Sequence, residues 1–169
     1  MFSPPSCSIR IEANEPVLVD LVHAHRGYIV DMTRMFVAGS LDAAWVARLE
    51  DMVAVKDTVV DVLDRGGLCS EAWEEGFALA DELGHASHLM GMAPDQSRFL
   101  GHSVGLQLDE SPVVAKGFER PLPIGATMAI EPKVVHAEGS IGTEDTWIRD
   151  EDGMRPITAD GLWPAITEW

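Results

Sequence analysis

The chain has 169 residues, 46% hydrophobic and 24% charged, which suits one domain with a buried core. Twelve Lys and Arg against 28 Asp and Glu give a net charge of −16, which argues against nucleic acid as a partner. We find no apolar run long enough to span a membrane and no signal peptide, and we expect no membrane partner. Cys7 and Cys69 are too few for a disulfide framework, so we expect reduced thiols and a cytoplasmic protein.

Two strands are expected near the start of the chain. Residues 17–22 are almost entirely apolar, and residues 27–37 are rich in β-branched and aromatic side chains. Because only a short polar segment, 23–26, separates them, the pattern predicts a hairpin.

Two helices are expected next. Apolar residues recur at helical spacing from 41 to about 63, with Ser40 as the expected N-cap and Gly66-Gly67 as the stop. Ser70 is the expected cap of a second helix that ends at Gly84.

The second half of the chain predicts a loop over 85–100, a short strand within 101–108 and an irregular stretch over 112–125. A second hairpin is expected from 126–135 and 141–149, and Trp163 and Trp169 in the tail are expected to pack against the body. Since strands and helices are segregated along the chain, the fold class is α+β with a mostly antiparallel sheet.

Acidic residues lie inside the first hairpin. With the turn at His25-Arg26, Asp20 faces Asp31, and directly opposed residues have Cβ atoms about 5 Å apart. Two buried carboxylates at that distance repel each other. The alternatives are an exposed sheet face, a shared proton or a shared cation.

The second hairpin repeats this arrangement. A turn near Ala137-Glu138 brings Glu131 opposite Glu144, and Pro132 predicts a bulge or an edge there because it lacks a donor. Between the hairpins, His102 lies in Gly-His-Ser-Val-Gly. It is either a core histidine with satisfied hydrogen bonds or a partner of these four acids.

Four carboxylates and one imidazole form a ligand set for two divalent cations. Oxygen-dominated ligation with one nitrogen favours Mn²⁺, with Co²⁺, Fe²⁺ and Zn²⁺ as competitors. Two such ions about 3.5–4 Å apart can activate water and polarise a carbonyl oxygen, which is the chemistry of metal-assisted hydrolysis.

These residues stand in four motifs, Val-Asp-Met-Thr-Arg, Gly-His-Ser-Val-Gly, Ile-Glu-Pro and Thr-Glu-Asp-Thr, after an Asp eleven residues upstream of the second Asp. The pattern, over about residues 16–150, resembles the M24 pita-bread metallopeptidases: methionine aminopeptidase, Xaa-Pro aminopeptidase, prolidase and creatinase. The string Gly-Tyr-x-x-Asp-x-Thr-Arg and the later Asp-Glu-Ser-Pro favour the prolidase-like, Xaa-Pro branch.

The resemblance implies a role for each residue. Asp20 would bind one metal ion, Asp31 and Glu144 would bridge both ions, and His102 and Glu131 would bind the other. Glu131 would also act as the general base.

The resemblance extends to supporting residues. Thr33 would support the ligands, and Arg34 would form an ion pair beneath the sheet or simply be exposed. Asp109 stands where the family has a substrate-binding histidine, seven residues after His102. An ionised Asp cannot donate to an oxyanion. Asp109 is therefore protonated, or it meets the substrate's ammonium group, or turnover is weak.

The resemblance also implies that residues 1–169 are a single, partial pita-bread catalytic domain. The chain looks like the C-terminal portion of the family's two-halved domain, without a separate N-terminal domain and without the histidine that precedes the first Asp in active members. An open sheet flank invites pairing, so we expect a homodimer.

The function implied is a dinuclear metallopeptidase that hydrolyses the N-terminal bond of a short peptide or dipeptide, with Xaa-Pro as the expected substrate. Two alternatives remain open. The chain is a degenerate, non-catalytic binding module of the same fold, or a creatinase-like hydrolase that acts on a small amidino or amide compound.

Overall fold

The computed structural model describes residues 10–158 and 166–168. Cys7, Trp163 and Trp169 lie outside these residues, so the expectations for them are not addressed; Cys69 is buried and free. The two helices are α1 (Ala43–Asp64) and α2 (Cys69–Glu82). The strands are β1 (Val17–His25), β2 (Tyr28–Val37), β3 (Phe99–Ser103), β4 (Glu110–Ala115), β5 (Thr127–Ile130), β6 (Lys133–His136), β7 (Gly139–Gly142), β8 (Asp145–Asp150), β9 (Gly153–Pro156) and β10 (Ile166–Glu168).

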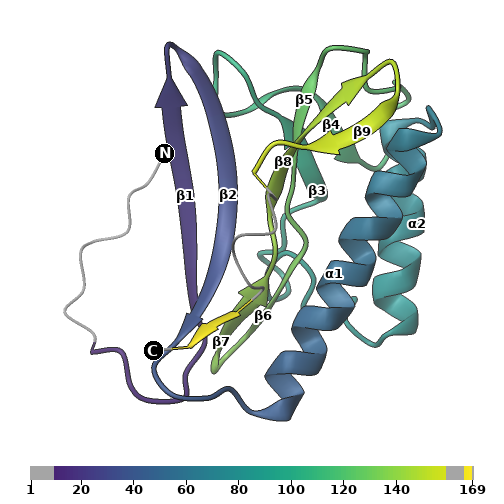
Figure 1. Ribbon diagram of the computed structural model, residues 1–169. Coiled ribbons are helices and arrows are strands. Elements are labelled where there is room, and N and C mark those ends of the chain that lie inside the picture. Colours follow the sequence, from purple (N-terminus) through teal and green to yellow (C-terminus); the bar gives the residue numbers. More distant parts are fainter. Residues whose placement is uncertain (1–9, 159–165, 169) are drawn as a thin grey trace.

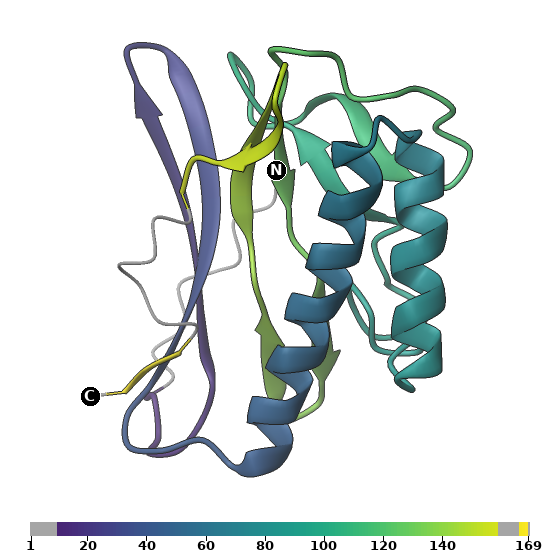
Figure 2. The same cartoon turned by 45° about the vertical axis from the view of Figure 1, so that its right-hand side comes forward.

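The strands form three groups, in the orders β1-β2-β10, β4-β3-β5-β8-β9 and β6-β7. All pairs are antiparallel except β10 with β2. The long β1–β2 hairpin lies on one side of the central strands and the two helices lie side by side on the other (Figures 1 and 2). This confirms the α+β class with a mostly antiparallel sheet.

The first hairpin forms as expected, but its register differs from the prediction. The turn is Arg26-Gly27, and both residues have positive φ, as a tight two-residue hairpin turn requires. Asp20 therefore pairs with Thr33, and Asp31 with Val22, so the prediction that Asp20 faces Asp31 is wrong. The slip is two residues, which leaves both carboxylates on the same face of the hairpin.

The second hairpin keeps the same register before and after residues 131–132, where its ladder is interrupted. Ile130 pairs with Asp145 before the gap and Lys133 with Gly142 after it, which sets Glu131 opposite Glu144 as predicted. Pro132 interrupts the ladder here, and its carbonyl accepts a hydrogen bond from the Thr143 N–H at 3.2 Å. The interruption is a break in the ladder without a change of register.

The N-cap residues of both helices differ from the predicted ones. The N-cap of α1 is Asp42, whose carboxylate accepts the Ala44 N–H at 2.7 Å, so Ser40 lies outside the helix. The N-cap of α2 is Leu68, which leaves Ser70 inside the first turn. The stretch over 112–125 also differs, because its first residues belong to strand β4 and were expected to be irregular.

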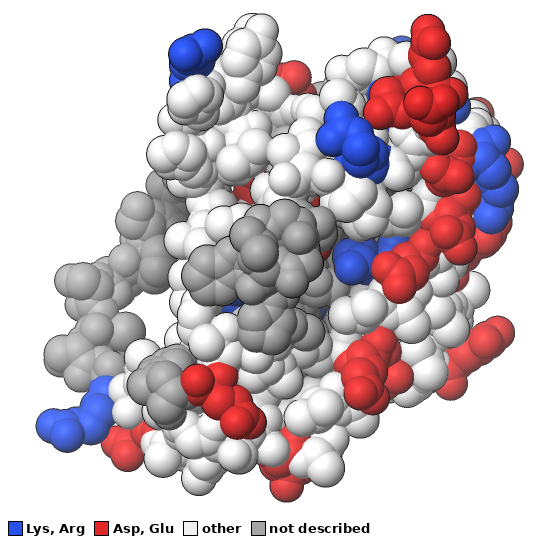
Figure 3. Space-filling view, in the orientation of Figure 1, with Lys and Arg blue, Asp and Glu red and all other residues white. Residues whose placement is uncertain are grey.

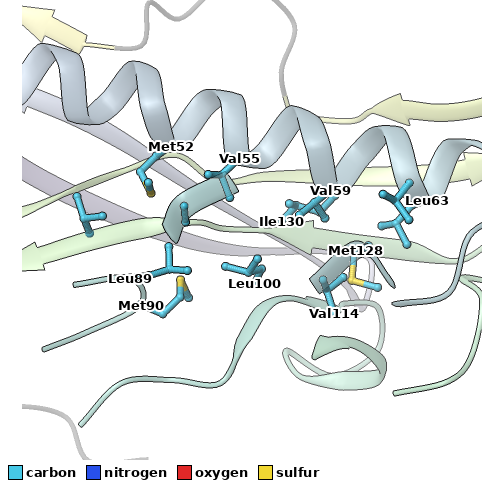
Figure 4. Close-up of a cluster of buried hydrophobic side chains, with 14 of the residues drawn as sticks. Met52, Val55, Val59, Leu63, Leu89, Met90, Leu100, Val114, Met128 and Ile130 are labelled. Atoms are coloured by element: carbon cyan, nitrogen blue, oxygen red, sulfur yellow. The ribbon is translucent and has the colours of Figure 1, made fainter. Parts of the chain in front are cut away.

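The core lies between α1, α2 and the central strands. Val55 and Val59 of α1 pack over Met128 and Ile130 of β5 and Leu100 of β3 (Figure 4). The Ile130 side chain points toward the helices. Because side chains alternate along a strand, the next side chain, Glu131, points to the opposite face. The packing of β5 against the helices thus orients the acidic residue away from the core.

The acidic surface lies apart from the buried acids. In Figure 3 the red side chains gather mainly on the right, over the two helices, where water solvates them. Among the described residues, no helix is both long and apolar enough to cross a membrane.

Candidate metal centre

Three central strands present their side chains in a row on the face opposite the helices. His102 pairs with Ala129, and Ala129 pairs with Thr146, so these side chains share one face. Glu131 lies two residues after Ala129, and Glu144 lies two residues before Thr146. Both side chains are therefore on that face as well. The sheet register therefore brings His102, Glu131 and Glu144 together from three strands.

The β1–β2 hairpin reaches this face through a seam of hydrogen bonds. The Asp31 N–H donates to Thr146 Oγ1 at 2.9 Å, and that hydroxyl donates to the Asp31 carbonyl at 2.8 Å. The Thr33 N–H donates to the Glu144 carbonyl at 3.2 Å, and Thr33 Oγ1 donates to Glu144 Oε2 at 2.6 Å. These contacts place Asp31 beside Glu144 and give Thr33 the supporting position that was expected.

Asp31, His102 and Glu144 converge into a buried cluster. One ligand atom from each lies within 4.8 Å of the others, and all three residues are buried. Asp31 Oδ2 lies 3.9 Å from His102 Nε2. Two oxygen ligands and one nitrogen ligand thus face a common point.

His102 is oriented by its backbone neighbour. Its Nδ1 lies 3.2 Å from the Ser103 carbonyl oxygen, which can only accept, so Nδ1 carries the proton. Nε2 is thereby directed to the carboxylates, 3.3 Å from Glu131 Oε1. Burial works to lower the pKa of His102, but its hydrogen bonds with Glu131 and Ser103 raise that pKa to about 9.

The crowded carboxylates resist ionisation. Burial and the Asp20 carboxylate raise the pKa of Asp31 to about 6. Burial and the Glu131 carboxylate raise the pKa of Glu144 to about 8, although the Thr33 hydrogen bond works to lower it. Either a proton or a cation relieves this repulsion.

Glu131 and Asp20 lie in different surroundings. Glu131 is buried, and its Oε2 accepts from Lys133 Nζ at 2.7 Å. Burial works to raise the pKa of Glu131, but the His102 and Lys133 contacts lower it. Asp20 is exposed on β1, and its side chain is hydrogen-bonded to that of Asp31.

Arg34 forms the buried ion pair that was one of its two expected placements. Its guanidinium donates to Asp145 Oδ1 at 2.9 Å and to the carbonyls of Thr33, Glu144 and Thr158 at 2.8, 3.0 and 3.0 Å. It therefore fixes the backbone of Glu144 from behind the cluster.

Asp109 lies at the mouth of the cluster. Its side chain is 72% exposed, and Oδ1 lies 3.7 Å from His102 Nδ1. The carboxylate is thus close to the imidazole and open to a molecule arriving from solvent.

The donor set fits a divalent cation. Asp31 Oδ1 is buried and has no hydrogen-bond partner among the described residues, which is costly unless something positive binds it. Buried carboxylate oxygens with one imidazole nitrogen suit Mn²⁺, Fe²⁺, Co²⁺ or Zn²⁺.

A comparison with known families assigns the chain. The sequence model described as "Metallopeptidase family M24" matches residues 2–151. The chain belongs to this family.

Two curated proteins that the chain resembles are Xaa-Pro dipeptidases. The chain is 27% identical over 150 residues to that of Pyrococcus furiosus and 25% identical over 149 residues to that of Lactobacillus delbrueckii subsp. lactis. Each match covers 88% of this chain but only 41% and 39% of the relative. The chain thus spans about two fifths of the length of the curated relatives it matches.

Solved structures share the M24 pita-bread fold. The prolidase from Pyrococcus horikoshii OT3 matches with a TM-score of 0.80 and 27% identity, over 90% of this chain and 42% of that one. A prolidase from Thermococcus sibiricus has a TM-score of 0.85, with 19% identity, over 99% and 43%. The N-terminal domain of the FACT complex subunit SPT16 from chickpea, 15% identical, has the same fold with a TM-score of 0.76, over 94% and 40%.

Sequence reasoning missed Lys133. It lies two residues after Glu131 on the same strand face, and its ammonium contacts that carboxylate. The alternation of side chains along the hairpin was the signal that could have found it.

Proposed function

We propose that this M24 chain is a metal-dependent peptidase that hydrolyses the N-terminal bond of short peptides, with Xaa-Pro dipeptides as the first substrates to test. The observation that carries the proposal is the buried convergence of Asp31, His102 and Glu144. The Xaa-Pro dipeptidase relatives support the substrate class. Because the chain covers only part of their length, its activity needs a direct test.

Asp31, His102 and Glu144 would hold the cation, with Mn²⁺ the first choice. Glu131 and Asp20 would complete a set of five ligands for two ions. A divalent ion bound there lowers the pKa of water and polarises a carbonyl oxygen.

The remaining residues would act around the substrate. Glu131, kept ionised by its contacts with His102 and Lys133, would accept the proton of the attacking water. Asp109, exposed beside His102, would receive the α-ammonium group of the peptide. Thr33 and Arg34 would hold Glu144 in place from either side.

Peptidase activity is tested with the Mn²⁺-loaded protein and a set of Xaa-Pro and Xaa-Ala dipeptides. Release of the free amino acid from Xaa-Pro, and its loss in Glu131→Gln, is expected. No release above the Glu131→Gln control would reject the proposal.

A non-catalytic binding module is the second candidate. It is favoured by Asp109, which replaces a donor with an acceptor, and by the ion pair that ties the Glu131 carboxylate to Lys133. Tight Mn²⁺ binding with no turnover of any dipeptide would favour this module. Turnover of amidino or small amide compounds in the same screen would favour a creatinase-like hydrolase instead.

A homodimer is also proposed, with β1 at the contact. β1 is the outer strand of its sheet, and Leu21 and Val22 on it are 40% and 52% exposed. An open strand edge with apolar side chains favours pairing with the same edge of a second copy. Light scattering at micromolar concentration tests this, and a monomer would contradict it.

A further inference from the structure

A cavity lies between α2 and the segment that leads into β3, on the helix side of the central strands. Its volume is about 230 Å³. Its walls include Trp73 and Phe77 of α2 and Leu100 of β3, which packs in the core with the helices (Figure 4). The candidate metal centre lies on the opposite face of these strands, so the cavity is a separate feature of the molecule.

Two aromatic rings form one wall of this cavity. Trp73 and Phe77 are one helical turn apart on α2, and their rings stack with centroids 5.0 Å apart and planes 13° apart. Both residues are only half-buried, so part of their apolar surface remains open. A wall of this kind favours contact with an apolar side chain.

The segment that closes the cavity is held by its own hydrogen bonds. Gln96 Nε2 donates to the carbonyls of Ala86 and Leu89, both at 2.9 Å, and the Ser97 N–H donates to the Met90 carbonyl at 3.0 Å. These bonds tie the two ends of the segment together. The cavity is therefore preformed, and a ligand does not have to order the segment in order to bind.

Two polar groups in the walls have no partner among the described residues. The two N–H groups of the Gln96 amide are used, but its Oε1 accepts no hydrogen bond. The Arg98 guanidinium forms neither an ion pair nor a hydrogen bond. One cavity thus combines a free acceptor, a free positive charge and an aromatic wall.

We propose that this cavity binds an apolar amino acid, either free or at the C-terminus of a peptide. The α-carboxylate would contact Arg98, the α-nitrogen would donate to Gln96 Oε1, and the side chain would pack on the aromatic wall. Its volume of about 230 Å³ lies below the roughly 300–1,000 Å³ of sites for drug-sized ligands, which suits a single amino-acid residue. This binding does not depend on the proposed metal-dependent activity.

Titration of the ¹⁵N-labelled protein with N-acetyl-L-leucine, followed by NMR without added metal, tests the proposal. The acetyl group removes the ammonium that a substrate would offer to Asp109. The net charge of −16 repels anions at long range, so the buffer contains about 0.15 M salt, which screens charges beyond about 8 Å. We expect saturable shifts of the Trp73 and Arg98 N–H signals, with a dissociation constant on the order of 1 mM for so small a ligand.

An analogue and two variants test the role of the charge. N-acetyl-L-leucinamide, which lacks the carboxylate, should bind the wild type about tenfold more weakly than the acid does. The acid should bind Arg98→Met more weakly by a similar factor. Arg155→Met is the matched control, since it removes the same charge at a 63% exposed side chain outside the cavity, and it should bind as the wild type does.

Free leucine and the peptide Ala-Ala-Leu distinguish the two sources of the ligand. Leucine that binds as tightly as its acetylated form would identify a free amino acid, and binding of the peptide but not of leucine would identify a peptide C-terminus. Either result supports the proposal.

Four results would overturn the proposal. They are no saturable shift with any of these ligands, equal affinities for the acid and the amide, an unchanged affinity in Arg98→Met, and largest shifts at Asp31 and Glu144 instead of in the cavity. The comparison of acid with amide uses the wild type alone, so it does not depend on the folding of a variant.

Discussion

Arg34 offers the sharpest test of how the candidate centre is held in place. In Arg34→Met the buried Asp145 carboxylate loses its ion pair, and three backbone carbonyls lose a donor. Removing one partner of a buried pair costs about 3–5 kcal/mol, because the other charge stays buried and unpaired. For a chain of this size, that lowers the unfolding temperature by roughly 6–20 °C.

The assay is thermal unfolding of the metal-free protein, followed by circular dichroism. Arg155→Met is the matched control, since its ion pair with Asp150 is exposed and worth at most about 1 kcal/mol, or less than about 4 °C. The Mn²⁺ affinity of Arg34→Met should also fall, by about 10–100-fold, because Arg34 holds the backbone of Glu144. Equal unfolding temperatures for the two variants would refute the reasoning.

Three further predictions follow from the same site. The pKa values of Asp31, Glu144 and His102 are raised, so the folded metal-free protein binds protons more tightly than the unfolded chain, and stability should fall as the pH rises from about 4 to about 9. A flatter profile is expected for Glu144→Gln, and an unfolding temperature that rises over this window would contradict the raised pKa values. Thr146→Val removes the hydroxyl that bonds both backbone groups of Asp31, and denaturant titration should show a loss of about 1–3 kcal/mol, whereas an unchanged midpoint would show that this hydroxyl does not hold the hairpin. In Gly101→Ala the new Cβ would lie 2.4 Å from a backbone oxygen of β5, so the strands must separate, and both stability and Mn²⁺ affinity should fall; a variant as stable as the wild type would disprove that close approach.

Much of the fold could be predicted because local rules decide it. The hairpins followed from apolar runs around short polar segments, and the helix ends from glycine, with Gly66 and Gly84 in positive φ. The N-cap of α1 was missed because Ser40 and Asp42 both suit that position, and only the backbone of the helix start shows that Asp42 holds it. The N-cap of α2 was missed because Leu68 carries no capping side chain that a sequence pattern could show.

The site was predicted in part for a related reason. Placing Asp20 and Asp31 on one face required only the parity of the strand, which survived a register error of two residues. The exposure of Asp20 depends on which elements lie over β1. Such tertiary contacts leave no periodic pattern in the sequence.

The seam between Thr33 and Glu144 has a thermodynamic consequence. Asp31 lies on the long hairpin, and His102 and Glu144 lie on the central strands, so an ion that binds all three also ties the hairpin to the body. Ligand binding that requires the docked hairpin stabilises docking by the same free energy. Amide hydrogen exchange along β2 should therefore slow when Mn²⁺ is added and quicken again on chelation, which makes the hairpin a reporter of occupancy.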